Sequence, residues 1–278
     1  MRLTRRDFLR STGAATLLLS LDRLAFAHRP IAMSRFGFKQ MKQAKLSKAR
    51  YIPLAFDGGF FHPKDIRMFS KDKFNVGMVA ANVGTYDRKA WQQNFEGYAK
   101  FHERHPDSML YVHTDIHAEQ SVNLEALARA VGIDIGFPFQ WQYYVGHSRE
   151  LMASIYNSFD VLLSCSRGEG FGIPIIEAQA CGTPVIATDF SSMSELATAL
   201  VQPAKLEWTP LNSWQSIPDV EQIDKVLEDA YTMKQDPTAW SEMKTRRVKF
   251  AEAYTLHNVM KNHMYPVFEE AAAAEIGA

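Results

Sequence analysis

The sequence predicts an α/β fold, with a doubly wound, Rossmann-like parallel sheet and a helical C-terminus. Short apolar runs without polar alternation recur from residue 74 onward, and segments with helical periodicity separate them. After Pro218 the chain is almost entirely helix-forming. Strands that lack alternation are buried on both faces, so helices must cover both sides of a parallel sheet.

The predicted elements alternate along the chain, and each strand is a compact apolar run. We expect strands over residues 51–56, 76–81, 109–113, 142–145, 160–164 and 184–188. We expect helices within residues 28–50 and over residues 88–103, 123–131, 149–158 and 174–180. The stretch from Asp57 to Pro63 is rich in turn residues and connects the first strand to the sheet.

The composition is that of an ordinary globular protein and excludes several classes. The 278 residues are 46% hydrophobic and 22% charged, which argues against disorder, collagen and coiled coil. Lysine plus arginine and aspartate plus glutamate both number 31, so the formal net charge is zero. A neutral chain has no long-range attraction for nucleic acid, and we expect no nucleic-acid partner.

The charge is unevenly distributed, because residues 1–50 hold twelve basic and only two acidic residues. Seven of the basic residues and none of the acidic ones fall within residues 28–50. A nucleic-acid-binding arm and a helix with a solvated basic face both fit this composition. The helix is favoured because Phe38 and Met41 fall near one helical stripe.

Residues 1–27 have the organisation of an export signal. Arg5-Arg6 is followed by an apolar run over residues 11–21 and by the small-x-small pattern Ala25-Phe26-Ala27. The segment resembles a twin-arginine signal, which implies export to the periplasm. An amphipathic helix with a chance arginine pair is the alternative. The run is far shorter than the ~20 apolar residues that span a bilayer.

The chain has two cysteines, Cys165 and Cys181. The predicted elements place Cys165 at the end of a strand and Cys181 at the far end of the following helix. These positions lie at opposite edges of a sheet, too far apart for a disulfide. We therefore expect both thiols to be reduced and buried.

A glycine-rich segment at residues 164–186 carries the most information about chemistry. It starts where a predicted strand ends, and glycines at every second position from Gly168 to Gly172 let the backbone turn and expose its amides. Pro174 suits the start of a helix, and Gly182 its end. A helix N-terminus therefore lies at the carboxyl edge of a parallel sheet, where such sheets bind ligands.

Two carboxylates flank this turn, Glu169 in the loop and Glu177 about one turn into the helix. A carboxylate near a helix N-terminus can be merely stabilising, by about 0.3–1 kcal/mol. A carboxylate that points into a cleft can instead accept hydrogen bonds from paired sugar hydroxyls. The residues alone leave both interpretations open.

The stretch from Glu169 to Ile186 resembles a family signature. Its EGFG-x-P-x-x-EA-x-A-x-G-x-PVI string, with Glu169 and Glu177 at the E-x7-E spacing, is similar to that of family-4-type (group 1) glycosyltransferases of the GT-B fold. The resemblance covers about residues 74–205, and residues 34–63 resemble the family's inter-domain connection. It implies a single GT-B donor domain that binds a nucleotide-diphospho-sugar.

The family pattern implies roles for the residues around this turn. Glu177 would hold the ribose of the donor, and Glu169 would contact the transferred sugar and take part in catalysis. The backbone amides that would contact the sugar and its phosphate belong to Gly170, Phe171, Gly172 and Ile173.

A second site element follows the first core strand, within residues 79–90. Arg88 and Lys89 stand where a helix starts, a locally unfavourable place for cations that suggests a bound anion. The family binds the donor diphosphate with an Arg after the strand and a catalytic Lys near the helix start, and Lys89 matches that Lys. Asn82 stands about where the Arg would be, so Arg88 is its substitute, with Gly84 in the loop. A solvent-facing Arg-Lys pair is the alternative.

Other catalytic motifs are missing from the sequence. No GxGxxG, GxxxxGK[ST] or HExxH string occurs, so no motif supports a dinucleotide oxidoreductase, a P-loop NTPase or a zincin. The pairs His102/His105 and His113/His117 have metal-like spacing, but one ends a helix and the other straddles a strand end. We expect no metal site, and no cofactor beyond the donor substrate.

Two functional hypotheses follow. The first is a glycosyltransferase that moves a sugar from a nucleotide-diphospho-sugar to an unknown acceptor, which is a glycan, a lipid or a small molecule. The resemblance implies that this transfer is retaining, metal-independent and hexosyltransferase-like. The second is a non-catalytic or split-enzyme donor-binding module, whose acceptor domain a partner chain supplies, because only about 45 residues separate the leader from residue 74. An exported sugar-binding protein is a third, resting on the leader alone.

This interpretation divides the chain into three parts. Residues 1–27 are a signal segment, residues 28–73 a basic helix and inter-domain connector, and residues 74–278 a nucleotide-sugar-binding domain. The leader and the chemistry indicate different compartments, because nucleotide sugars are cytosolic whereas a twin-arginine signal exports folded protein. Both the periplasm and the cytoplasm or inner-membrane surface stay open.

Overall fold

The computed structural model of the chain describes residues 30–84, 86–138, 146–210 and 212–276. The expected leader at residues 1–27 and the expected strand at residues 142–145 lie outside the described residues. None of the described helices is both long enough and apolar enough to cross a bilayer.

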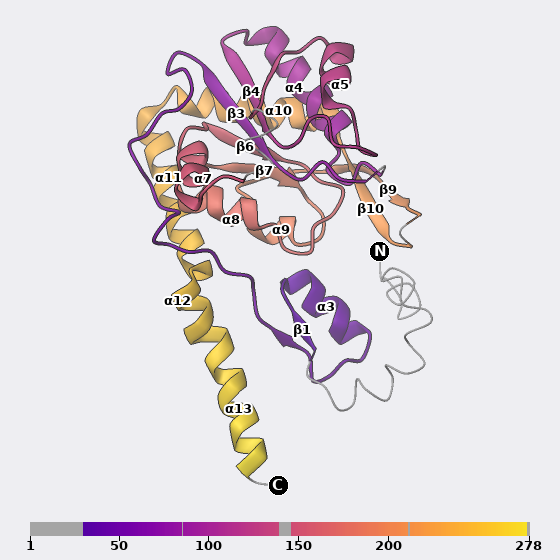
Figure 1. Cartoon of the computed structure of the whole chain (residues 1–278), viewed down its shortest axis with the longest axis vertical. Coiled ribbons are helices and arrows are strands. Elements are labelled where there is room, and N and C mark those ends of the chain that lie inside the picture. The colour runs from indigo at the N-terminus through magenta and orange to yellow at the C-terminus, as the bar shows by residue number, and fades with distance from the viewer. Residues whose placement is uncertain (1–29, 85, 139–145, 211, 277–278) are drawn as a thin grey trace.

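A six-stranded parallel sheet lies at the centre of the fold, in the order β5–β4–β3–β6–β7–β8 (Figure 1). Its strands are β3 (Phe74–Val79), β4 (Ser108–His113), β5 (Ile135–Gly136), β6 (Val161–Ser164), β7 (Val185–Thr188) and β8 (Ala199–Val201). The strand order reverses between β3 and β6, which is a topological switch point where the following loops diverge. The prediction of a doubly wound parallel sheet is confirmed.

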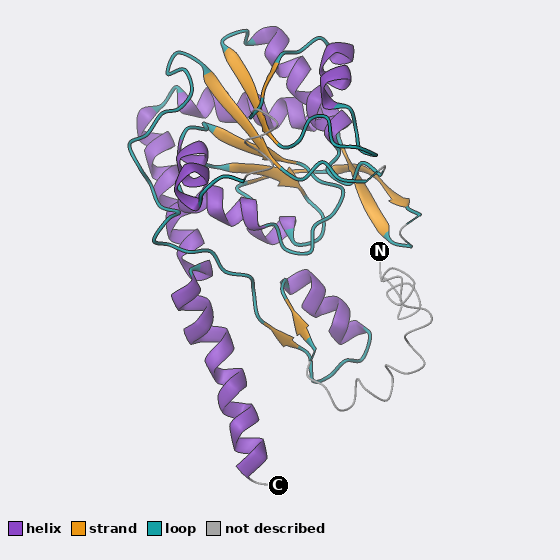
Figure 2. Ribbon diagram, viewed as in Figure 1, coloured by secondary structure: helices purple, strands orange, loops and turns teal. Residues whose placement is uncertain are grey.

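Helices cover both faces of the sheet (Figure 2). One apolar cluster lies under α4 (Trp91–Arg104), α5 (Leu124–Val131) and α10 (Val220–Lys234). The other lies under α7 (Arg149–Asn157), α8 (Ile173–Ala180), α9 (Met193–Leu196) and the end of α11 (Pro237–Ala251). The four central strands, β3, β4, β6 and β7, are buried on both faces, which is why their sequences lack alternation.

The chain ends as a series of helices that leaves the sheet and runs past an N-terminal unit (Figure 1). The helical series is η1 (Glu252–Tyr254), α12 (Leu256–Val259), η2 (Met260–Met264) and α13 (Tyr265–Ile276). The N-terminal unit is β1 (Ile31–Ala32), α3 (Arg35–Gln43) and β2 (Arg50–Tyr51). Arg50 pairs with Glu270 at 2.6 Å, and Tyr51 packs edge-on against His263, so the unit is fixed to the C-terminal helices. The predicted helical C-terminus is confirmed.

Several short elements differ from the prediction. The strand expected over residues 51–56 is only β2, which pairs with β1. Pro53 interrupts this run because proline has no N–H for a strand ladder. The antiparallel hairpin of β9 (Pro203–Trp208) and β10 (Trp214–Pro218) was not predicted, and neither were β5 and β8. β5 and β8 have only two and three residues, and β9 is half-exposed, so none of them carries a long apolar run.

Strand β3 packs directly against Phe159 through Gly77, and this contact is testable. In Gly77→Ala the added methyl would lie 2.3–2.4 Å from ring carbons of Phe159. We expect the variant to lose about 1–3 kcal/mol of unfolding free energy through overpacking. Gly136→Ala is the matched control, because that strand glycine has no neighbour closer than 3.4 Å to the added methyl. Urea unfolding measures both, and equal stabilities would contradict the described packing.

Candidate functional site

The loops that follow β3 and β6 face each other at the topological switch point. The backbone N–H of Arg167, in the loop after β6, donates to the carbonyl of Arg88, in the loop after β3, at 2.9 Å. The buried side chain of Asn94 donates to the carbonyl of Lys89 at 3.1 Å and to that of Cys165 at 3.0 Å. Both loops are therefore held in a fixed relation at the edge where parallel sheets bind ligands.

The carboxylate of Glu169 lies between two cations. Arg88 Nη1 is 3.0 Å from Oε2 of Glu169, and Lys89 Nζ is 2.6 Å from Oε1. Arg88 also donates to the carbonyl of Gly168 at 3.0 Å. Burial by itself raises the pKa of Glu169, but the charges of Lys89 and Arg88 outweigh it and hold that pKa below its ordinary value. Glu169 is thus ionised and paired, and its side chain is only 13% exposed.

The N-terminus of α4 has its own anion. The carboxylate of Asp87 accepts from the backbone N–H of Trp91 at 2.9 Å and of Gln92 at 3.3 Å. The helix begins at Trp91, three residues later than predicted, after Ala90 in the left-handed region (φ 51°). Arg88 and Lys89 therefore do not face an uncapped helix end, and the anion that they contact is Glu169.

The turn into α8 depends on one glycine more than on the others. Gly172 has φ 106°, and a Cβ there would lie 2.9 Å from Cδ1 of Ile175, so a side chain is excluded twice over. Gly168 and Gly170 have no positive φ, so they are not needed for the sharp turn that we expected of all three. Gly170 is instead exposed, and a Cβ added there would lie 3.6 Å from the sulfur of Met33 in the N-terminal unit.

The loop before α8 has its carbonyls bound and its amides available. Ser192 Oγ donates to the carbonyls of Glu169 at 2.9 Å and Phe171 at 2.7 Å, and Ser191 Oγ accepts from the Glu169 N–H at 3.0 Å. The Phe171 side chain is buried against Tyr254, so only its backbone faces the site. Among the described residues, the N–H groups of Gly170, Phe171, Gly172 and Ile173 donate no hydrogen bond. Amides at a helix N-terminus suit an anion.

Glu177 has different partners from Glu169. It lies on the first turns of α8, and its Oε2 accepts from the hydroxyl of Tyr156 on α7 at 3.1 Å. Burial raises the pKa of Glu177 to about 7, and the Tyr156 hydrogen bond and the charge of Arg149 offset this only in part. The two glutamates therefore occupy separate positions, one against the loop after β3 and one against α7.

Asn82 and Gly84 lie beside the two cations, as the sequence suggested. Together with Arg88 and Lys89 they line a hollow of about 20 Å³, room for one water molecule. The amide of Asn82 donates to the carbonyls of Asp115 and Val122 at 3.1 and 2.8 Å. Only its oxygen is left for a ligand.

Three residues that shape the site were not predicted from the sequence, namely Asn94, Ser191 and Ser192. Asn94 is a polar residue on a helix face that is otherwise apolar, which was an available signal. Ser191 and Ser192 follow β7, so they stand at the carboxyl edge of the sheet, and their position was a second signal.

The cysteine prediction is confirmed, because Cys165 and Cys181 are both buried and free. Burial raises the pKa of the Cys181 thiol to about 12, which keeps it protonated. The histidines with metal-like spacing have local partners. His105 contacts Glu228 at 2.8 Å, and His113, at the end of β4, packs edge-on against the ring of His147. Where the structure describes the chain, no three His, Cys, Asp or Glu side chains form a group that could hold a metal.

A protein-family model matches the part of the chain that carries most of this site. The family model described as glycosyl transferases group 1 matches residues 87–246, more than half of the chain. The chain belongs to this family. The matched region includes both cations, the glycine-rich turn and both glutamates.

Two curated relatives that this chain resembles are D-inositol 3-phosphate glycosyltransferases. The one from Corynebacterium jeikeium (strain K411) is 29% identical over 150 residues, which are 50% of this chain and 35% of the relative. The one from Mycobacteroides abscessus is 39% identical over 57 residues, 20% of this chain and 13% of the relative. The matches thus span about a third or less of the length of these relatives.

Solved structures of glycosyltransferases share the fold. Sucrose-phosphate synthase from Thermosynechococcus elongatus superimposes with a TM-score of 0.68 at 19% identity, covering 88% of this chain and 58% of that one. Anabaena HepE in complex with UDP-glucose superimposes with a TM-score of 0.63 at 16% identity, covering 86% and 63%. At these identities the likeness shows the fold alone, which is the Rossmann-like GT-B type.

The raised pKa of Glu177 makes a prediction about stability. Because that pKa is about 7 in the folded chain and 4.5 ordinarily, the native state binds more protons than the unfolded chain between these values. The unfolding free energy therefore falls as pH rises from 4.5 through 7. Glu177→Gln should raise the melting temperature at pH 8, by the equivalent of about 1–2 kcal/mol, and the gain should shrink toward pH 5.

The control for this prediction is Glu103→Gln, which removes an exposed carboxylate from α4. Melting curves of both variants across pH 5–8 separate the two cases. A gain in Glu177→Gln that does not change with pH would contradict the buried, protonatable carboxylate.

Proposed function

We propose that the chain binds the diphosphate of a nucleotide-diphospho-sugar at the switch point and transfers the sugar to an acceptor. The observation that carries this proposal is the pair of cations, Arg88 and Lys89, opposite the free amides of residues 170–173. Two cations and a helix N-terminus that converge from neighbouring strands match a group with two to three negative charges. The UDP-glucose held by Anabaena HepE supports a nucleotide sugar as the donor class.

Each site residue has a role in this proposal. In this proposal the donor binds between the loops that follow β3 and β6, a place that we call the donor crevice. Arg88 and Lys89 contact the diphosphate there, and Asn82 and Gly84 line the small hollow beside the two cations. The amides of Gly170, Phe171, Gly172 and Ile173 contact the phosphate and the transferred sugar. Glu177 accepts from the ribose hydroxyls, and Tyr156 fixes its position.

Donor binding requires an exchange of partners. Both oxygens of Glu169 are engaged by the cations, so a diphosphate competes with this carboxylate for Arg88 and Lys89. A diphosphate carries more charge than one carboxylate and displaces it. The released Glu169 can then accept a hydroxyl of the sugar that is to be transferred.

The chemical step depends on charge stabilisation. As the bond between the sugar and the diphosphate breaks, negative charge grows on the departing phosphate. Lys89, Arg88 and the α8 N-terminus are already oriented toward it, and preorganised charge of this kind usually supplies the largest part of catalysis. We propose a retaining, metal-independent transfer, the mode that the resemblance implies. The acceptor is a glycan, a lipid or a small molecule.

A donor-binding module that a partner chain completes is the second candidate. The two-stranded β1–β2 sheet favours it, because so small a sheet is marginal by itself. Ile31 of β1 and Met33, which follows β1, are also exposed. Met33 also lies beside Gly170, so a partner docked there would border the donor crevice. Sugar transfer or donor hydrolysis by the purified chain alone would exclude this candidate.

If a diphosphate replaces Glu169 as the partner of the two cations, removing the charge of Lys89 and removing the charge of Glu169 should have opposite effects on diphosphate affinity. Lys89→Met should weaken the binding of a nucleoside diphosphate by at least about tenfold, because one phosphate contact is lost. Glu169→Gln should strengthen the same binding several-fold, because the competing negative charge is gone, and should abolish transfer. Calorimetric titration with UDP, GDP and ADP measures both effects.

Lys225→Met serves as the control, since this exposed lysine lies on α10 away from the crevice. It should bind like the unaltered chain. If none of the three diphosphates binds, or if Glu169→Gln weakens binding as Lys89→Met does, the proposed competition is wrong.

A further inference from the structure

A second, larger hollow lies at the opposite edge of the sheet from the donor crevice. Its volume is about 830 Å³, and its walls are α11, the end of α10 and the connector before β3. Gly182, just past the end of α8, is at its floor, whereas the glycine-rich turn is at the other end of that helix. The two sites are therefore separate, and no part of the proposed glycosyl transfer uses this hollow.

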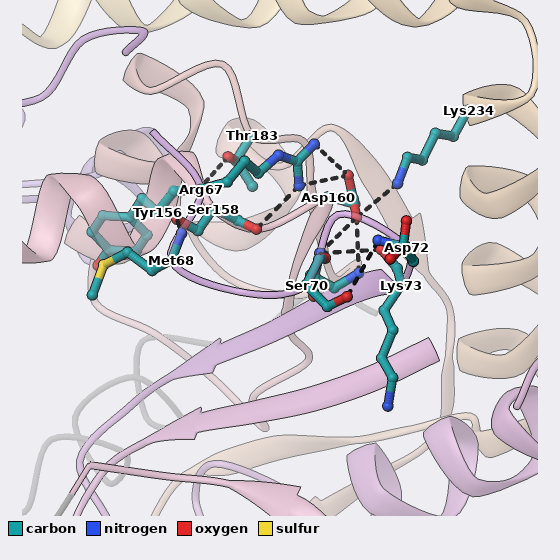
Figure 3. Close-up of polar contacts among 11 residues, drawn as sticks. Arg67, Met68, Ser70, Asp72, Lys73, Tyr156, Ser158, Asp160, Thr183 and Lys234 are labelled. Carbon is teal, nitrogen blue, oxygen red and sulfur yellow. Dashed lines mark hydrogen bonds and ion pairs between the residues drawn. The ribbon is translucent and has the colours of Figure 1, made fainter. Parts of the chain in front are cut away.

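Three cations line this hollow, and two of them pair with one buried carboxylate. Arg67 Nη2 lies 3.3 Å from Oδ1 of Asp160, and Lys234 Nζ lies 2.9 Å from Oδ2. Figure 3 shows the two side chains reaching Asp160 from the connector and from α10. Asp160 also accepts from the backbone N–H of Asn75 at 2.8 Å, and its side chain is 1% exposed. Its acceptor capacity is taken up by Arg67, Lys234 and Asn75.

The third cation, Lys244 of α11, has no such partner. Within the ranges that the structure describes it makes no ion pair or hydrogen bond, although it is partly buried. Burial lowers the pKa of Lys244, and the charges of Arg67 and Lys234 lower it further, while Asp160 acts in the opposite direction. Lys249 and Glu252 also line the hollow and offset each other in formal charge. The cluster therefore keeps a surplus of about two positive charges.

We propose that this hollow binds the phosphoryl group of a small phosphorylated molecule through Lys244, Lys234 and Arg67. A phosphomonoester carries about the −1.5 to −2 charge that would neutralise the surplus. The volume lies within the ~300–1,000 Å³ of typical small-molecule sites and far exceeds a phosphate ion, so an organic part is accommodated. Trp240 and Pro237 line the same hollow and provide an apolar surface for that part.

The proposal explains why a cation is kept where it is unfavourable. A partly buried lysine without a partner costs stability, and an apolar side chain of similar length would not. Lys244→Met should therefore fold at least as well as the unaltered chain and lose phosphoryl binding. Arg67 and Lys234 are poorer choices for a test, because their removal would leave Asp160 with fewer partners.

The indole N–H signals of the five tryptophans in a ¹H–¹⁵N spectrum provide the readout. Trp240→Phe identifies the signal of Trp240. Glucose 6-phosphate and inorganic phosphate should both shift this signal, the first at a concentration at least about tenfold lower, and glucose should not shift it. Lys244→Met should weaken both effects by at least about tenfold. Lys225→Met, the exposed lysine of α10, should leave them unchanged, and Lys244→Gln repeats the test with a polar neutral side chain.

Three results would overturn the proposal: a Trp240 signal that neither phosphate moves, a shift that sodium chloride reproduces at equal ionic strength, or equal responses in Lys244→Met and Lys225→Met. The donor site is tested separately by Lys89→Met, which should leave the Trp240 response intact. If phosphate loses its effect on Trp240 in Lys89→Met but not in Lys244→Met, the ion binds at the crevice and not in this hollow.

Discussion

The carboxylate of Glu169, held between Arg88 and Lys89, is the interaction on which the rest of the site depends. It joins the loop after β3 to the loop after β6 across the point where the strand order reverses. The Arg167 N–H and the Asn94 amide reinforce the same junction through the backbone. A carboxylate held between two fixed loops keeps both cations oriented toward one point before any ligand arrives.

The elements that bury the most apolar surface could be predicted from the sequence. The apolar sequence runs that form β3, β4, β6 and β7 have no polar alternation. Each of these strands begins and ends within two residues of its expected bounds. The end of α8 could also be predicted from the sequence, because a glycine often follows the last residue of a helix. Gly182 adopts the left-handed conformation that this position favours. The β9–β10 hairpin was missed since it pairs at the edge of the fold and is half-exposed, which leaves it without a core pattern.

The contacts of the candidate site could be predicted only in part. The sequence indicated that Arg88 and Lys89 mark an anion site, but it could not show that Glu169, 80 positions away, already occupies it. It also could not show that Asp87 caps α4, because aspartate at that place fits a turn equally well. The cluster of Arg67, Asp160 and Lys234 has no sequence signature at all, since three distant segments bring its members together.

A crystal structure of the chain with a bound nucleoside diphosphate tests most directly whether the diphosphate replaces Glu169 at the two cations. We expect the diphosphate to contact Lys89, Arg88 and the amides at the start of α8. We also expect the carboxylate of Glu169 to have left both cations. A diphosphate bound elsewhere, with Glu169 still paired to Arg88 and Lys89, would contradict this expectation.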